Sequence, residues 1–392
     1  MPQAGKPTPP AGGRGQLGGV LTVSAGHALH DSYTAFLPPL LPAFIRHLAL
    51  SKTEAGLLSV FLQAPSFLQP FIGYLADRAS LRYIVILAPA VTAMMMSLLG
   101  IAPAFGWLAL ALTVAGVSSA AMHAVGPVIA GRLSGHRLGR GMGFWMVGGE
   151  LGRTLGPLLI VSWVRWQSLA GTPWLMLGGL AASFLLYLRL RHVTVRPPEG
   201  APALHWREAL RAMAPLLLPL SGIIVARAFL LSMLTTFFPT FLSDEGASLW
   251  LAGAALTILE AAGVVGALVG GSLSDRLGRG RILLLSMVTT PVWMIAFLLL
   301  DGWVRIPLLV LMGFCGLAVT PVIMALVQES YPENRALANG LYMSISFGLR
   351  AVVIVILGAI ADLSSMRIAF LAGTLAPVLA LPLLTRLPRR QS

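Results

Sequence analysis

The sequence predicts an all-α membrane protein, with twelve transmembrane helices in two pseudo-symmetric six-helix bundles. Three observations lead to this prediction. The chain is 57% hydrophobic and only 10% charged, whereas a soluble domain has about 25% charged residues. It contains twelve apolar segments, each long enough to cross a hydrocarbon core of roughly 30 Å. One loop signature also occurs twice, 198 residues apart, as Gly73-Tyr74-Leu75-Ala76-Asp77-Arg78 and Gly271-Ser272-Leu273-Ser274-Asp275-Arg276.

The apolar segments divide equally between the two halves of the chain. The first six are expected at about 18 to 44, 54 to 75, 83 to 101, 107 to 130, 141 to 163 and 172 to 188. The second six are expected at about 214 to 241, 249 to 273, 282 to 300, 305 to 327, 337 to 360 and 367 to 385. A half-length unit used twice is typical of transporters whose parallel halves face each other across a central site.

The polar segments define the remaining organisation. We expect a disordered cytoplasmic tail over residues 1–17, bundles over 18–188 and 213–385, a cytoplasmic linker over 189–212 and a second tail over 386–392. The net charge of +13 comes mainly from Lys and Arg in segments that would be cytoplasmic if both termini lie inside. This is the positive-inside bias of a multi-pass membrane protein. It favours contact with anionic lipid over a nucleic-acid surface.

Sequence motifs of soluble enzymes are absent. The chain has no phosphate-binding loop with Lys, no Cys or His spacing typical of a metal site and no nucleophile elbow. We therefore expect neither an enzyme nor a cofactor or metal. Energy for transport would come from an ion gradient, with the proton as the default ion, or from the gradient of the substrate itself.

The duplicated loop and the apolar pattern resemble the major facilitator superfamily over essentially the whole chain. The resemblance implies the major facilitator fold. It also implies that Asp77, Arg78, Asp275 and Arg276 act in gating between the halves. A simpler alternative is that these residues only hold a turn. In a transporter both readings can apply, because a charge pair that breaks during rocking acts as a gate.

A glycine motif lies in the segment at 141 to 163. Gly143, Gly152, Gly156 and Pro157 follow the spacing Gly-x8-Gly-x3-Gly-Pro, which resembles the motif associated with antiporters in this superfamily. The alternative is helix packing alone, because small residues four apart let a neighbouring helix approach closely.

Three passages narrow the resemblance to the fosmidomycin resistance protein branch of the superfamily. They are Gly26-His27-Ala28-Leu29-His30-Asp31 with the prolines that follow, Leu68 to Tyr74, and Val147-Gly148-Gly149-Glu150 with Gly156-Pro157. This resemblance implies a bacterial inner-membrane, proton-coupled efflux pump for small drugs or related anionic compounds.

Charged residues inside the apolar segments are the candidate site. Each costs about 2.5–3.5 kcal/mol to insert near the bilayer centre, so each should face a central cavity. They are Asp31, Glu150, Arg153, Arg227, Glu260 and Arg350.

The three arginines are the candidate substrate-binding residues, with His123 as a weaker candidate. Arg153 and Arg350 occupy equivalent positions in the two repeats, so they would face each other and form a fork for phosphonate, phosphate or carboxylate. The alternative is internal neutralisation, in which Glu150, Glu260 and Asp31 balance the three arginines.

Asp31 is the best candidate proton carrier, with His27 one helical turn before it and His30 adjacent. Glu150 and Glu260 are the other carboxylates of the proton-coupling set. The alternative makes Asp31 and the histidines hydrogen-bonded packing groups.

Three functions remain open at this point. The first is a proton-coupled exporter of a small anionic or zwitterionic compound, acting as a monomer. The second is a proton-coupled uptake symporter or exchanger for an organic anion. The third is a membrane receptor that transports nothing, which the cost of burying charges in both halves disfavours.

Overall fold

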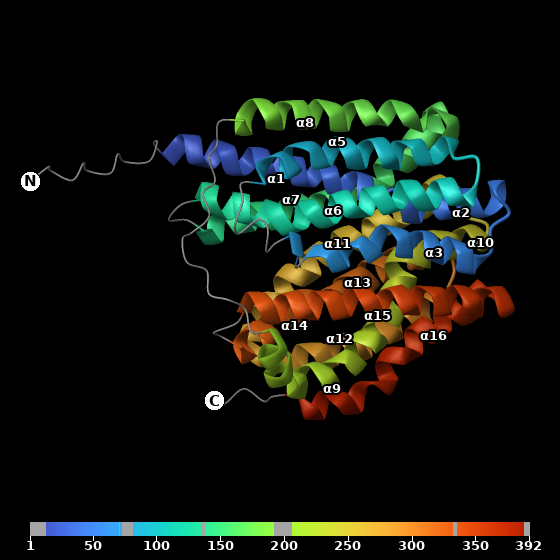
Figure 1. Cartoon of the computed structure of the whole chain (residues 1–392). Coiled ribbons are helices and arrows are strands. Elements are labelled where there is room, and N and C mark those ends of the chain that lie inside the picture. The colour runs from blue at the N-terminus through green and yellow to red at the C-terminus, as the bar shows by residue number, and fades with distance from the viewer. Residues whose placement is uncertain are drawn as a thin grey trace, which may run out of the picture.

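The computed structural model describes residues 13–69, 71–72, 81–134, 138–191, 206–331 and 335–387, and every regular element in these residues is helical (Figure 1). The first half contains α1 (Gly13–Thr34), α2 (Leu37–His47), α3 (Lys52–Gln63), η1 (Ala64–Leu68), α5 (Arg82–Leu98), η2 (Leu99–Ile101), α6 (Phe105–Ser134), α7 (Leu138–Gln167), η4 (Leu169–Leu175) and α8 (Met176–Leu190). The second half contains α9 (Trp206–Ser232), η5 (Met233–Phe237), α10 (Phe238–Asp244), α11 (Leu249–Leu277), α12 (Arg279–Leu299), η6 (Gly302–Val304), α13 (Arg305–Leu317), α14 (Thr320–Ser330), α15 (Arg335–Leu363), α16 (Met366–Leu379) and η7 (Leu381–Arg386).

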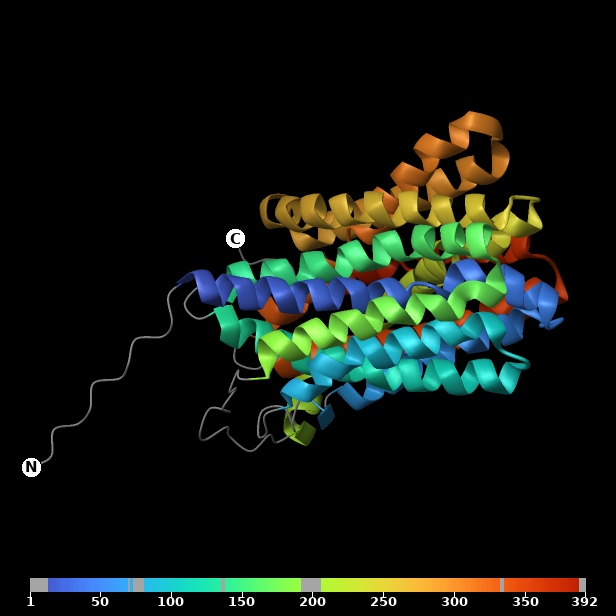
Figure 2. The same cartoon turned by 90° about the horizontal axis from the view of Figure 1, so that it is seen from above.

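The long helices lie roughly along one common axis, as expected for membrane spans (Figure 2). Among the described residues, nine helices are long and apolar enough to cross a membrane. The span predicted at 54 to 75, part of which lies outside the described residues, is not among these nine, and neither are α1 and α7. These two helices carry the buried Asp31 and the Glu150–Arg153 pair, so polar residues of the candidate site replace apolar ones there.

Three of the predicted spans contain a break between helices that the apolar pattern did not reveal. The span predicted at 18 to 44 consists of α1 and α2, and α2 starts with a proline in its first turn. Proline has no N–H to continue the preceding helix. In the second half, α9 passes through the π-helical turn η5 into α10. The span predicted at 305 to 327 is divided into α13 and α14.

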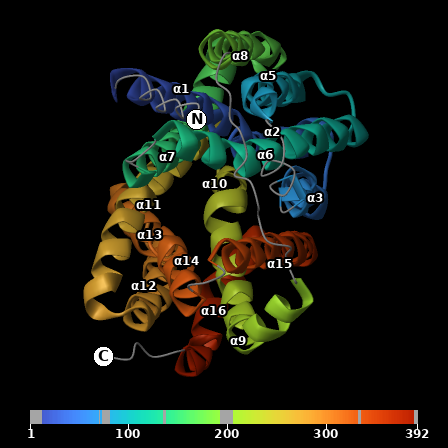
Figure 3. The ribbon, with the colours of Figure 1, turned by 60° about the vertical axis from the view of Figure 1, so that its left-hand side comes forward.

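The two halves form separate groups of helices. In the first half α1 packs against α7, and α5 packs against α6 and α8. In the second half α9 packs against α15 and α16, and α11 packs against α13. Figure 3 shows the two groups one above the other, joined through α3 with α15, α7 with α11, and α2 with α10.

One close helix contact occurs in both halves at equivalent positions. A Cβ added to Gly116 would lie 2.4 Å from the carbonyl oxygen of Leu62, and one added to Gly313 would lie 2.0 Å from that of Leu259. Each residue of the second pair is 197 positions after its counterpart. Only glycine permits such an approach of backbones, so the duplication of the sequence is also a duplication of packing.

The outer surface of the helices is apolar. Large hydrophobic side chains are exposed on both halves, including Leu87, Leu110, Phe184, Leu268, Val292 and Leu299. In water such a belt would be unstable, whereas lipid tails solvate it. The chain is a multi-pass membrane protein.

Polar contacts join the two halves at one end of the molecule, on the right in Figure 1. The Asp362 carboxylate accepts hydrogen bonds from the backbone N–H groups of Lys52 (2.6 Å) and Thr53 (2.8 Å) at the start of α3. Lys52 Nζ pairs with Asp244 at 2.8 Å, and Arg46 donates to Ser243 at 3.1 Å. We call this end the sealed end. The start of α1 and the end of η7 lie toward the opposite end.

Candidate functional site

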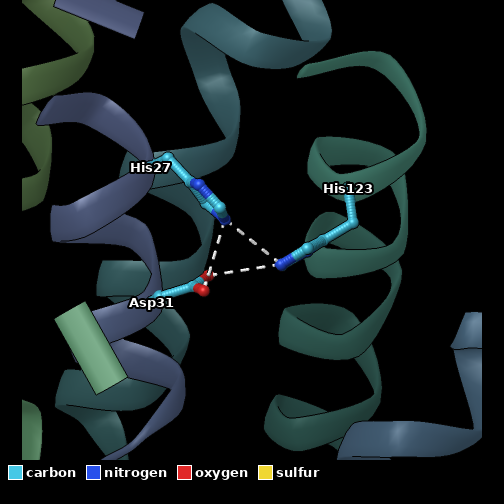
Figure 4. Close-up of side chains that lie close together, drawn as sticks. All are labelled: His27, Asp31 and His123. Carbon is cyan, nitrogen blue, oxygen red and sulfur yellow. Dashed lines mark hydrogen bonds and ion pairs between the residues drawn. The ribbon is translucent and has the colours of Figure 1, made fainter. Parts of the chain in front are cut away.

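Asp31 lies between two histidines from different helices (Figure 4). Its Oδ2 is 3.3 Å from Nε2 of His27, one turn earlier in α1. Its Oδ1 is 3.5 Å from Nε2 of His123 in α6. The two Nε2 atoms are themselves 3.3 Å apart. His27 and Asp31 are buried, whereas the His123 side chain is 31% exposed.

The hydrogen-bond partner of Nδ1 in each histidine ring indicates which ring nitrogen carries the proton. Nδ1 of His27 is 2.9 Å from the backbone oxygen of Trp145, and Nδ1 of His123 is 2.9 Å from that of Ser119. A carbonyl oxygen can only accept a hydrogen bond, so both Nδ1 atoms donate. In neutral rings both Nε2 atoms then present lone pairs to the Asp31 carboxylate. Three acceptors therefore converge, and a cation is needed to join them.

Trp145 of α7 contacts His27 in two ways. Its ring stacks on the His27 ring, with centroids 3.7 Å apart and planes at 11°, while its carbonyl accepts from Nδ1. The neighbouring His30 is fully buried, but neither of its ring nitrogens makes a hydrogen bond of good geometry. His30, which the sequence placed beside Asp31 at the proton site, therefore makes no hydrogen bond or ion pair with the Asp31 carboxylate. His123 of α6 is the second histidine of this site instead.

A run of glycines brings α7 against α1. Cβ atoms added to Gly148, Gly152 and Gly156 would lie 2.4, 2.1 and 2.4 Å from the carbonyl oxygens of Ser24, Ala28 and Ser32. These residues are four apart on both helices, so each turn of α7 meets one turn of α1. Gly152 and Gly156 of the predicted motif therefore pack a helix pair, and Pro157 follows inside α7.

The remaining glycine of the motif behaves differently. A Cβ added to Gly143 would meet nothing within 4 Å in the part of the chain that the structure describes. Gly149, which lies outside the motif, faces the site: an added Cβ would lie 2.5 Å from Cε1 of His27 and 3.0 Å from Oδ2 of Asp31.

Glu150 and Arg153 form an ion pair on α7. Their side chains are 28% and 46% exposed. Arg153 interacts electrostatically with Asp31 and with Glu260 of α11 in the other half. The internal pairing considered from the sequence is present here, so the charge of Arg153 is partly neutralised by its own helix.

The two arginines of the second half have hydroxyl partners instead. The buried Arg227 of α9 donates to the Thr320 hydroxyl at 3.3 Å, and it interacts with the buried Tyr342. Arg350 of α15 donates to Thr235 at 2.6 Å and to Thr236 at 3.3 Å. Among the described residues, neither arginine has a carboxylate within salt-bridge distance. Asp31 contacts histidines, and its interaction with Arg153, like that of Glu260 with Arg350, is electrostatic without a salt bridge among the described residues.

Local backbone structure explains how two neighbouring threonines reach one guanidinium. Thr235 and Thr236 lie in the π-helical turn η5, and such turns are frequent at functional sites. Nε of Arg350 is buried without a hydrogen-bond partner. Glu260 interacts electrostatically with Arg350 of its own half and with Arg153 of the other half.

The gating residues lie partly outside this description. Asp77 and Arg78 fall outside the described residues. In the second copy, Asp275 pairs at 2.6 Å with Arg279, which also pairs at 2.6 Å with Glu329 at the end of α14. Arg276 is exposed beside them. Asp275 therefore joins α11, α12 and α14 within one half, as expected of a charge cluster that stiffens a turn.

Sequence reasoning missed Trp145, Thr235, Thr236, Thr320 and Tyr342. One signal was available for two of them, because Trp145 and Tyr342 occupy equivalent positions 197 residues apart. Both are buried and both lie beside the candidate site of their half. The threonines carry no such signal, since a hydroxyl in an apolar helix usually bonds its own backbone.

Comparison with known proteins identifies the family. The model of the Major Facilitator Superfamily matches residues 23–346, and a second match covers residues 255–392. The chain belongs to the major facilitator superfamily. It is a secondary transporter by this membership, and its helices and the duplicated loop agree with that assignment.

Individual relatives also match most of the chain. The chain is 25% identical to the fosmidomycin resistance protein of Escherichia coli (strain K12), over 97% of this chain and 95% of that protein. It is 23% identical to the multidrug resistance protein MdtG of Salmonella dublin, over 87% and 92%. A bacterial homologue of the human lysosomal transporter Spinster, in an inward-facing and unoccupied conformation, has the same fold, with a TM-score of 0.76, 17% identity and coverage of 95% and 97%.

Proposed function

We propose that the chain is a proton-coupled exporter of small anionic or zwitterionic compounds of the fosmidomycin type. In this proposal the anion binds to Arg227 and Arg350, and the transported proton binds among Asp31, His27 and His123. The observation that carries the proposal is that two arginines within the membrane have hydroxyl partners and no carboxylate within salt-bridge distance among the described residues.

An anionic substrate would supply the missing charge. A guanidinium offers a planar fork of N–H donors that matches the oxygens of a phosphonate, phosphate or carboxylate. The hydroxyls of Thr235 and Thr320 hold the two guanidinium groups in place without neutralising them. Arg153 is less suited to bind the anion directly, because Glu150 already accepts from it.

A chain of charges links the anion site to the proton site. Arg350 interacts with Glu260 and Arg153, and Arg153 interacts in turn with Asp31 and His123. An anion bound at Arg350 therefore changes the electrostatic field at Asp31 through Arg153. Because a nearby charge alters the proton affinity of a carboxylate, occupancy of the anion site and the protonation state of Asp31 become coupled.

Three findings support export over uptake. The glycine spacing of α7 resembles that of antiporters, and two relatives are named for resistance to fosmidomycin and to multiple drugs. If the basic loops are cytoplasmic, both termini lie in the cytoplasm of a bacterial cell and the sealed end faces outward. The polar contacts that join the halves would then lie on the outer side, as in a carrier that is closed toward the outside.

Flux in oriented vesicles tests the proposal. Purified protein is first screened by thermal shift against phosphonates, phosphorylated metabolites and amphiphilic drugs, and a radiolabelled hit is then used for transport. We expect accumulation in everted vesicles with an acidic interior. Accumulation in right-side-out vesicles driven by external acid would instead indicate the uptake symporter, and saturable binding without flux in either orientation would indicate a receptor.

Asp31→Asn separates the proton site from the rest of the carrier. The variant should still exchange substrate for substrate but should no longer accumulate it when a pH gradient is imposed, because the neutral amide removes the proton-binding step. Glu150→Gln and Glu260→Gln are the matched controls and should retain driven accumulation. If Asp31→Asn retains it and either control loses it, the proton site lies on α7 or α11 instead.

A further inference from the structure

We propose that His27, Asp31 and His123 also form a binding site for a divalent transition metal ion of the zinc type, and that an ion bound there arrests transport. The ion would replace the cation that the three acceptors require. The binding itself follows from the geometry of the three side chains, while the arrest rests on the proposed role of Asp31 in coupling.

Hydrogen bonds to backbone carbonyls orient both histidine rings for metal binding. Zinc binds a deprotonated imidazole nitrogen, and a histidine ligand usually donates its other ring N–H to a carbonyl or carboxylate that fixes the ring. Both histidines meet this condition, through Trp145 for His27 and Ser119 for His123. Stacking on Trp145 further fixes the orientation of the His27 ring. The Nε2 lone pairs thus point at the site before any ion arrives.

The separation of the two histidine nitrogens matches one coordination geometry. In a tetrahedral zinc site with bonds of about 2.0–2.1 Å, neighbouring ligand atoms lie about 3.3–3.5 Å apart. The two Nε2 atoms are 3.3 Å apart, and they lie 3.3 and 3.5 Å from different oxygens of the Asp31 carboxylate. One ligand atom from each residue can be chosen so that all three lie within 4.8 Å of one another. An octahedral site with similar bonds would bring neighbouring ligands to about 3 Å. Two imidazoles and one carboxylate are also a donor set that suits zinc, whereas magnesium and calcium prefer oxygen donors.

The site can be entered from one side. His27 and Asp31 are buried, while the His123 side chain is 31% exposed, so an ion would arrive along His123. Gly149 closes the α7 side, where even an added Cβ would lie 2.5 Å from His27 and 3.0 Å from Asp31. Three protein ligands leave a fourth tetrahedral position for water or for a ligand group, as in zinc sites that are not purely structural.

Metal binding is tested without any substrate. Protein free of a polyhistidine tag, in chelator-free buffer, is titrated with Zn²⁺ by calorimetry and with Co²⁺ by visible absorption. We expect one saturable ion per chain and the intense absorption of tetrahedral Co²⁺. His27→Gln and His123→Gln should each weaken binding about 100-fold or more, since loss of even an outer-shell partner costs about 10–100-fold. His47→Gln, at the exposed end of α2, is the matched control and should change nothing.

The outcomes separate the two parts of the proposal. Absence of saturable binding at millimolar ion, or equal binding by native protein and a folded His123→Gln variant, would overturn the metal site. If the ion binds as expected, Zn²⁺ should abolish proton-driven accumulation by native protein, and removal of the ion with a chelator should restore it. Full driven accumulation by zinc-loaded native protein would overturn the arrest. Because the titration needs no transport, its result stands even if the anion exporter proposal fails.

Discussion

The helix pairs α1–α7 and α9–α15 occupy equivalent places in the two halves, but the polar groups at their candidate sites differ. In α1–α7 a glycine run packs the helices backbone to backbone and three acceptors converge beside Trp145. In α9–α15 the positions equivalent to Gly148, Gly152 and Gly156 are Ile345, Leu349 and Val353. There Arg227 and Arg350 meet threonine hydroxyls.

This difference shows how a duplicated scaffold acquires two kinds of site. Glycine lets backbones approach closely, so the short side chain of Asp31 reaches the histidines of its own and a neighbouring helix. The larger residues on α15 hold the helices further apart, and there the polar contacts are made by long arginine side chains. Both halves keep one aromatic residue beside the site, as Trp145 and Tyr342. In our proposal one half binds the cation and the other the anion.

The largest effect is expected from removing the positive charge of the second half. Arg227→Gln and Arg350→Gln should each weaken binding of an anionic substrate by about 1.5–3 kcal/mol, the value of one charged hydrogen bond. Lys at either position keeps the charge but loses the planar fork, so its effect should be intermediate. Equilibrium binding of the radiolabelled hit to purified variants measures the order.

Arg153→Gln provides the matched comparison from the first half. Its effect on affinity should be smaller, because Glu150 already neutralises Arg153. A larger loss for Arg153→Gln than for Arg227→Gln would mean that the anion binds between the halves at the fork predicted from the repeat. If folded Arg227→Gln and Arg350→Gln variants bind the substrate with native affinity, these arginines do not form an anion site.

The next effect concerns the glycine run. Gly152→Ala places a methyl group 2.1 Å from the carbonyl oxygen of Ala28, so α1 and α7 must separate. Overpacking of this kind costs about 1–3 kcal/mol, and the midpoint of thermal unfolding should fall. Gly143→Ala is the control on the same helix, since its Cβ meets nothing within 4 Å among the described residues. Equal stability of the two variants would argue against tight packing of α1 and α7.

The smallest effect is expected at the sealed end. Asp362 accepts from the first backbone N–H groups of α3, where a negative charge contributes about 0.3–1 kcal/mol. Asp362→Asn should therefore shift the population toward the conformation open at this end by about two- to fivefold. Distances between spin labels at Ser168 and Ala247 report the shift.

Asp301→Asn is the control for that measurement. Asp301 is 87% exposed and pairs with Arg305 inside the second half, so its loss should leave the distribution between the two conformations unchanged. A distribution unaffected by Asp362→Asn would mean that apolar packing between α3 and α15, rather than this carboxylate, keeps the end closed.

The sequence alone determined the architecture, because membrane-spanning helices require long apolar segments and a duplicated loop reveals the two halves. It also identified the charged residues, since their burial in a membrane is costly wherever it occurs. The helix breaks before Leu37 and at Met233–Phe237 were not visible in the apolar pattern. The partners of Asp31, Arg153, Arg227 and Arg350 depended on the tertiary structure. Asp31 and His123 are 92 positions apart, and Arg227 and Thr320 are 93 apart. No local spacing rule connects such residues; helix packing brings them together.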